Sequence, residues 1–124
     1  MPQCLAELKV AVARVGINPA NGQFFDCAGG IRGVAQWAVV AEAADKPIVI
    51  GTEWGAGLKV AAKLHLGAAL PNADPVVELT EIMIHELLLK EPLQLEDGYL
   101  RVPLGPGLGL ELDEAKIRAF TITS

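Results

Sequence analysis

The sequence predicts an α/β domain built on a parallel sheet. Apolar residues recur at helical spacing in several stretches, short β-branched runs stand between these stretches, and glycine or proline separates one from the next. Strands that alternate with helices of about 10–15 residues are typical of βαβ units, in which neighbouring strands are parallel. A chain of 124 residues fits one domain, residues 1–124.

The elements are expected to alternate along the chain, beginning with a helix. Ile48-Val49-Ile50 is β-branched throughout and shows no alternation, which suits a parallel strand buried on both faces. Val34, Trp37, Ala38 and Ala41 fall on one face of a helix. In chain order, the expected elements are a helix over 3–15, a strand over 23–27, a helix over 31–44, a strand over 48–50, a helix over 57–70 and a strand over 76–79.

The C-terminal third is rich in turn signals. EIMIHELLLKEPL fits either a helical turn or a strand, and residues 98–102 alternate as in a strand. Asp113 is placed to cap a last helix, EAKIRAF. GPGLG, residues 105–109, looks like a phosphate-binding loop, but such loops need a following Lys-Ser/Thr, which is absent here. The segment is therefore interpreted as a turn, in which the glycines let the chain reverse closely.

Charge and composition exclude several classes of function. The net charge is −5 and the basic residues are scattered, which argues against a nucleic-acid binder. No apolar run approaches the roughly 18 residues of a membrane span. Cys4 and Cys27 lack CxxC spacing and are interpreted as reduced thiols, and no signal-peptide pattern is visible, so a cytoplasmic location is expected.

Four segments together resemble one enzyme group. AEAADKPIVIGTEWGAGLKVAAKLHLGAALPNA resembles the seventh strand and helix of the mandelate racemase/muconate lactonizing group of the enolase superfamily. GGIRGVAQWAVVAEAA is similar to that group's sixth-strand loop and helix, and DPVVELTE resembles its eighth strand. DGYLRVPLGPGLGLELDE is similar to its closing segment, and the resemblance covers about residues 25–120.

The resemblance implies a partial TIM (β/α)8 barrel, made of roughly the last three βα units and the C-terminal closing segment. The N-terminal capping domain and the early strands of such an enzyme are expected to lie outside this chain. The group's common step is abstraction of a proton α to a carboxylate, which gives a Mg2+-bound enediolate in racemases, cycloisomerases and acid-sugar dehydratases. Such chemistry needs a cation and hydrogen-bond donors at the developing oxyanion, with a base nearby.

The resemblance also assigns site residues at the strand ends, where barrel enzymes place their catalytic groups. Glu78 matches the eighth-strand acid that hydrogen-bonds the substrate carboxylate, because a protonated carboxyl can donate to an enediolate. Glu53 and Trp54 follow the seventh strand and are expected to line the substrate pocket. A rim glutamate and a packing tryptophan are the alternative interpretation of this pair.

The sixth strand departs from the group's pattern. The lactonizing branch carries a lysine base five residues before the paired glycines Gly29-Gly30, and Phe24 stands there in this chain. A phenylalanine cannot accept a proton, so Phe24 is assigned only to the substrate pocket. Asp26 lies two residues further on, on the same side of a regular strand, and is a weaker candidate for a catalytic group.

No native metal site is predicted within this chain. The group's three Mg2+ ligands lie on the third to fifth strands, and Mg2+ needs about six oxygen ligands. His65 lies in an apolar helical stretch, and His85 has no HExxH spacing, so neither is assigned to a metal.

Two hypotheses of function remain open. The chain is either the C-terminal part of an enolase-superfamily enzyme, inactive alone, or a non-catalytic α/β module derived from that barrel. Because three strands cannot close a barrel, we expect a partner: a second copy of the chain, or the missing N-terminal half. A small carboxylate substrate is expected only in a complete barrel, with no nucleic-acid or membrane partner. An independent small enzyme is a third alternative, but no nucleophile–base pair is visible.

Overall fold

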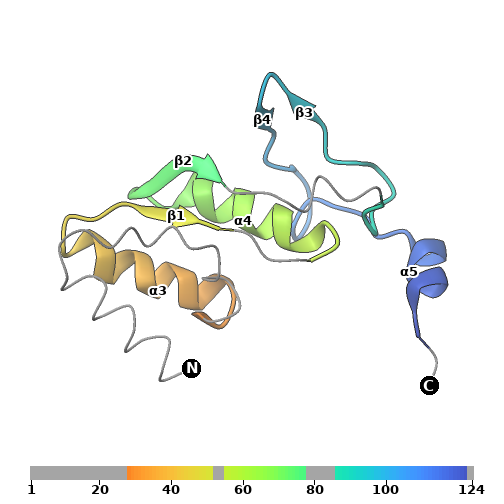
Figure 1. Ribbon diagram of the computed structural model, residues 1–124, viewed down its shortest axis with the longest axis horizontal. Helices are drawn as coiled ribbons and strands as arrows, with labels where there is room; N and C mark the ends of the chain where they lie inside the picture. The colour runs from red at the N-terminus through yellow and green to blue at the C-terminus, as the bar shows by residue number, and fades with distance from the viewer. Residues whose placement is uncertain (1–27, 52–54, 78–85, 123–124) are drawn as a thin grey trace.

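A computed structural model describes residues 28–51, 55–77 and 86–122 (Figure 1). The helices and strands in this part of the chain are α3 (Ile31–Glu42), β1 (Ile48–Ile50), α4 (Leu58–Ala69), β2 (Ala73–Val77), β3 (Leu95–Glu96), β4 (Tyr99–Leu100) and α5 (Glu114–Phe120). The order helix, strand, helix, strand from α3 to β2 confirms the predicted alternation. The helix and strand predicted over 3–15 and 23–27 lie outside the described residues.

Helix α3 buries the face that its sequence predicts. Val34, Trp37, Ala38 and Ala41 are all buried, and the helix ends at Glu42, two residues before the predicted end. It stops there because the chain turns through Asp45, whose φ of 54° is left-handed and incompatible with a continued helix.

Strands β1 and β2 form a two-stranded parallel sheet, as the β-branched pattern predicts. Ile48 pairs with Ala73 and Ile50 pairs with Val77, so the register shifts between the two pairs. The shift covers the stretch that contains Pro75, which has no backbone N–H to donate to the ladder. β2 begins at Ala73, three residues before the start of the predicted strand at residue 76, because Ala73 already pairs with Ile48.

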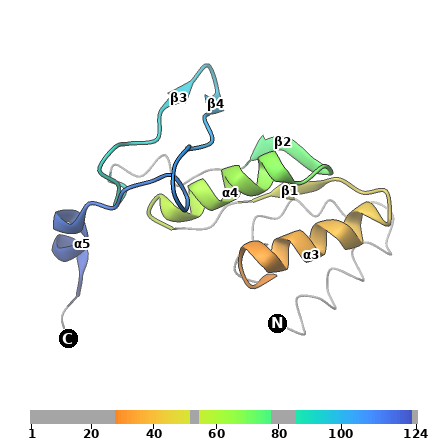
Figure 2. The same cartoon turned by 180° about the vertical axis from the view of Figure 1, so that it is seen from behind.

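The core lies between the sheet and the two helices that run alongside it (Figures 1 and 2). Leu70 and Ala73 pack against both of its clusters and so join them. The buried members of the first cluster are Ala28, Val34, Trp37, Ile50 and Leu66, and those of the second are Ala38, Ala41 and Ile48. The small and aliphatic side chains pack α3 and α4 directly on β1 and β2.

Residues 86–122, here called the C-terminal arm, extend beyond the N-terminal end of α4 (Figure 1). β3 and β4 form a hairpin in which Leu95 pairs with Leu100 and Glu96 pairs with Tyr99. The strand predicted over 98–102 is thus only two residues long, because β3 offers no longer partner. Its partner strand, β3, lies in the same chain.

The hairpin turn explains why those strands meet. Asp97 and Gly98 both have positive φ, 50° and 82°, as the two central residues of a type I′ turn require. The described part of EIMIHELLLKEPL, residues 86–93, is neither helix nor regular strand, and Leu89 makes an isolated bridge to Leu112.

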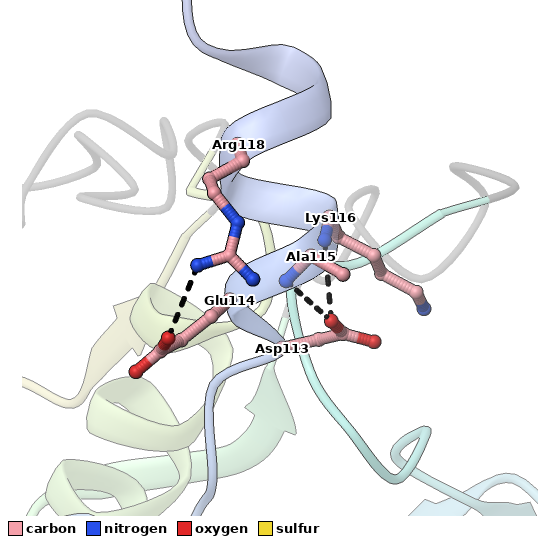
Figure 3. Close-up of polar contacts among 5 residues, drawn as sticks. All are labelled: Asp113, Glu114, Ala115, Lys116 and Arg118. Atoms are coloured by element: carbon pink, nitrogen blue, oxygen red, sulfur yellow. Dashed lines mark hydrogen bonds and ion pairs between the residues drawn. The ribbon is translucent and has the colours of Figure 1, made fainter.

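Helix α5 begins where the sequence predicts. Asp113 Oδ1 accepts hydrogen bonds from the backbone N–H groups of Ala115 and Lys116, at 2.9 and 3.1 Å (Figure 3). Glu114 and Arg118 form an i,i+4 ion pair at 3.3 Å on the exposed side. None of the seven residues of α5 is buried, so its capping and tertiary contacts must hold it in place.

No helix in the described part of the chain is long and apolar enough to span a bilayer.

Candidate active site

The carboxyl ends of β1 and β2 lie at one edge of the sheet, because the two strands are parallel. β1 ends at Ile50, and the following Gly51 is buried. Glu53 follows β1 by three residues, and Glu78 directly follows the last residue of β2, Val77. The sequence-assigned residues Phe24, Asp26, Glu53, Trp54 and Glu78 all lie outside the described residues. Their roles therefore stay predictions, while the structure describes the framework that carries two of the three strand ends.

Asn72 fixes the opposite end of that framework. Its side-chain amide donates to Ala38 O at 2.9 Å and to Lys46 O at 3.3 Å. Its backbone carbonyl accepts a hydrogen bond from Ile48 N–H at 2.9 Å. One residue thus joins α3, the turn before β1 and the start of β2. The carbonyl oxygens of Ala38 and Lys46 are both acceptors, so the amide nitrogen of Asn72, and not its oxygen, must face them. The side-chain oxygen Oδ1 is then buried without a hydrogen-bond partner among the described groups.

The sequence pattern marks Asn72 only as part of the run Pro71-Asn72-Ala73-Asp74-Pro75, which breaks the helix before it. The signal that could have identified it is an asparagine directly before a strand, where a side-chain amide can bond neighbouring backbone groups.

The loop between β1 and α4 is held by the C-terminal arm. Leu88 N–H donates to Ala56 O at 3.0 Å, and Leu89, only 2% exposed, covers Gly57. Ala56 and Gly57 have φ values of 51° and 103°, so both stand in the left-handed region. The arm therefore meets the body of the molecule at the loop that leads from β1 into α4.

A second contact joins the arm to α4. His65 is half-buried in this helix, as its apolar surroundings predict, and its Nε2 lies 3.3 Å from Leu108 O. Leu108 belongs to the GPGLG segment, which is confirmed as a turn: Gly109 N–H donates to Pro106 O at 3.1 Å. His65 thus tethers the glycine turn to α4.

The arm also contains a cavity of about 490 Å³. Its lining includes two exposed ion pairs, Lys90–Glu111 at 2.7 Å and Arg101–Glu96 at 3.4 Å. The hydrogen bond from Lys90, and then its charge, lower the pKa of Glu111 below 4.5. All of the lining residues lie between Lys90 and Glu111 of the arm, and none belongs to β1, β2 or the loop that joins β1 to α4, so this cavity lies apart from the strand-end edge.

Comparison with known proteins identifies the family. A family model described as "Enolase C-terminal domain-like" matches residues 26–116, most of the chain. The chain belongs to this family. Muconate cycloisomerase 1-1 of Acinetobacter lwoffii is 39% identical over 111 residues, which are 89% of this chain and 29% of that protein. A chloromuconate cycloisomerase of Pseudomonas putida is 34% identical over 75% of this chain and 25% of its own length.

Solved structures of this superfamily share the fold. A putative sugar isomerase from Streptomyces coelicolor has a TM-score of 0.70 and 32% identity, over 74% of this chain and 24% of that one. A mandelate racemase/muconate lactonizing enzyme from Sulfitobacter gives 0.57 and 31%, over 77% and 24%. An enolase from Gibberella zeae, complexed with magnesium, formate and sulfate, gives 0.66 and 28%, over 73% and 22%.

These matches confirm that the chain corresponds to the C-terminal part of an enolase-superfamily α/β barrel. The chain spans only a quarter to 29% of the length of the two cycloisomerases.

The described residues do not supply the Mg2+ site that such enzymes imply. Within 28–51, 55–77 and 86–122, no three side chains of His, Cys, Asp or Glu come together as a set that could hold a metal ion. Mg2+ is bound through carboxylate oxygens, usually with several waters retained.

Proposed function

We propose that this chain supplies the last three βα units and the closing segment of an enolase-superfamily enzyme that removes a proton α to a carboxylate. The observation that carries the proposal is the 39% identity to a muconate cycloisomerase across 89% of the chain. The parallel pairing of β1 with β2 supports it, because it turns two consecutive strand ends toward one edge. Alone, the chain is inactive, because the remaining strands carry the other catalytic groups.

Each assigned residue has a distinct role in this proposal. Glu78 donates a hydrogen bond from its protonated carboxyl to the substrate carboxylate as negative charge develops there. Glu53 and Trp54 line the pocket and orient the substrate. Phe24 lines the pocket but cannot act as the base, so the base comes from another part of the barrel.

The partner in this proposal is the polypeptide that supplies the remaining strands, or a second copy of the chain that covers the same edges. The substrate is a small carboxylate, and Mg2+ belongs to the complete barrel. A cytoplasmic location is part of the proposal and is supported by the interpretation of Cys4 and Cys27 as reduced thiols.

A second candidate is a non-catalytic module of the same ancestry. Phe24 favours it, because this residue stands where the lactonizing branch has its lysine base. The two candidates make different predictions for a protein in which the barrel is complete.

Two chimeras separate them. In the first, residues 26–116 of this chain replace the matching segment of the Acinetobacter lwoffii cycloisomerase, which keeps that enzyme's own residue at the position of Phe24. In the second, the transplanted segment starts at residue 23 and brings Phe24 with it. Under the enzyme proposal we expect the first chimera to cycloisomerise muconate, and this chimera decides between the candidates. The second should lose most of its kcat under either candidate, because it removes the host's own residue at the position of Phe24, and it therefore tests that position alone.

The role of Glu78 is tested in the first chimera. Glu78→Leu, which removes the donor, should lower kcat about 10²- to 10³-fold, the usual effect of losing one donor to a developing oxyanion, and Glu78→Gln, whose amide can still donate, should lower it less. Glu42→Gln, at an exposed position of α3, is the matched control and should leave kcat unchanged. A folded first chimera without activity would overturn the enzyme proposal and favour the module.

A further inference from the structure

The C-terminal arm meets the loop that follows the strand-end edge through Leu87, Leu88 and Leu89. This loop, Gly55 to Gly57, leads from the predicted pocket residues Glu53 and Trp54 into α4. Leu88 N–H bonds Ala56 O at 3.0 Å. A β-carbon added to Gly57 would lie 2.8 Å from Leu89 Cδ1 and 3.4 Å from Leu87 Cβ, so the arm packs directly against the glycine backbone.

Leu89 is itself held rigidly from the other side. It bridges to Leu112, and Lys90 N–H and Asp113 N–H donate to Glu111 O and Leu88 O, both at 3.0 Å. Lys116 Nζ reaches Leu87 O at 3.3 Å and Leu89 O at 3.4 Å from the first turn of α5. The backbone around Leu89 is therefore fixed by its pairing with residues 111–113 and by the ammonium group of Lys116. This fixes the point from which the Leu89 side chain reaches the loop.

The loop needs such support because its backbone is strained. Ala56 stands at a φ of 51°, a left-handed conformation that is unfavourable for a residue with a β-carbon. A strained conformation persists only where its surroundings determine it. Leu58 N–H closes the turn from within by bonding Gly55 O at 3.1 Å, and the contacts from 87–89 to Ala56 and Gly57 hold it from outside.

We infer that Leu89 is a positioning residue: by packing on Gly57 it fixes the path along which the strand-end loop enters α4. This inference rests on the proposed function for the role of the loop, but not for the contact itself. It makes the arm a part of the site's framework, so that disturbing the arm changes the surroundings of Trp54.

The test uses the two tryptophans of the full chain as separate reporters. With 5-fluorotryptophan incorporated, Trp37 in the buried core and Trp54 in the loop each give one 19F resonance, assigned through the Trp54→Phe variant. Leu89→Ala should move the Trp54 resonance by more than its linewidth and leave the Trp37 resonance in place. Leu89→Met, which refills the space, should restore the wild-type position.

Leu104→Ala is the matched control, since Leu104 lies on the same arm but is 92% exposed and should move neither resonance. Lys116→Met is the second variant, because it removes only the amine that holds Leu87 and Leu89 from behind. It should move the Trp54 resonance in the same direction by a smaller amount. If Leu89→Ala does not fold, the Trp54 resonance of Lys116→Met tests the inference in its place.

An unmoved Trp54 resonance in a folded Leu89→Ala protein, or equal movement of both tryptophans, would overturn the inference. None of these readouts measures enzymatic activity. An inactive chimera would therefore overturn the proposed function without affecting the inference about Leu89.

Discussion

At the scale of single residues, two positions carry more structural information than their side-chain types suggest. Asn72 connects three backbone segments through two donated hydrogen bonds and one accepted one. Gly109 stands where the closing turn folds back on Pro103, so that the backbone leaves no space for a β-carbon. The partners of Asn72 are distant in the sequence, at separations of 34 and 26 residues for its two donated bonds, whereas Gly109 meets Pro103, six residues earlier in the same turn.

Asn72→Ala should lower the free energy of unfolding by about 2 kcal/mol, since it removes two hydrogen bonds worth about 1 kcal/mol each. Urea unfolding of the full chain measures the change. Asn72→Asp keeps the shape but turns a carboxylate toward the carbonyls of Ala38 and Lys46, so it should be at least as unstable. Wild-type stability in either variant would contradict the assigned role.

Gly109→Ala should loosen the closing turn more than Gly107→Ala does. Both glycines have positive φ, 69° and 65°, so both substitutions carry the cost of about 1–2 kcal/mol for a left-handed residue. At Gly109 the new carbon would also lie 2.7 Å from Pro103 C and 2.8 Å from its O, whereas the space at Gly107 is open. Hydrogen exchange of the residue 109 amide measures the loosening, and equal exchange in the two variants would contradict it.

At the scale of elements, the arm is held by polar contacts more than by burial. Helix α5 has seven residues and buries none of them, although an isolated helix shorter than about 12–15 residues is marginal in water. The Asp113 cap therefore fixes its start (Figure 3). The contacts of Lys116 with the carbonyl oxygens of Leu87 and Leu89 hold the same turn, and the Lys90–Glu111 pair reinforces the backbone pairing that leads into it. Such an element should respond to pH.

The pair Lys90–Glu111 should stabilise the arm at neutral pH and lose this effect in acid. The folded pKa of Glu111 lies below 4.5, so its contribution is present above 4.5 and disappears as the pH falls through the folded pKa. The pKa of Lys90 is raised above 10.5, chiefly by the same hydrogen bond, so that contribution is lost only in stronger alkali.

An NMR titration of the Glu111 carboxyl carbon tests this account. The midpoint should lie below 4.5 in the wild type and return toward 4.5 in Lys90→Met. Since both side chains are exposed, added salt should also raise the midpoint. A midpoint that does not change on removal of Lys90 would show that the ion pair does not form in solution.

At the scale of the whole molecule, the described part is an open piece of a barrel. Its parallel sheet has two strands, and several large apolar side chains on the arm are well exposed: Leu95, Tyr99, Leu104, Phe120 and Ile122. Open sheet edges and exposed apolar side chains favour association.

The full chain should therefore self-associate in a concentration-dependent way when no other polypeptide covers these surfaces. Analytical ultracentrifugation over a range of concentrations measures the average mass. Phe120→Ser combined with Ile122→Ser should shift the equilibrium toward monomer if α5 takes part. A clean monomer at low micromolar concentration would contradict the expectation of a homo-oligomer.

The sequence by itself determined the local elements and the family. Helical spacing predicted α3 and α4, the β-branched run predicted β1, and Asp113 predicted the start of α5, because these signals depend on neighbours along the chain. The motifs from GGIRGV to GPGLG indicated the enolase superfamily for the same reason, since each occupies one contiguous stretch.

Only the tertiary structure decided how these elements are connected. The sequence placed a longer strand at 98–102 and a later start for β2, because neither the short partner β3 nor the register shift around Pro75 can be read from local pattern. Asn72, His65 and Leu89 owe their roles to groups far away in the sequence: Lys46 is 26 residues from Asn72, Leu108 is 43 residues from His65, and Gly57 is 32 residues from Leu89. Such contacts depend on how the chain folds back on itself, and the physics of a local stretch does not specify them.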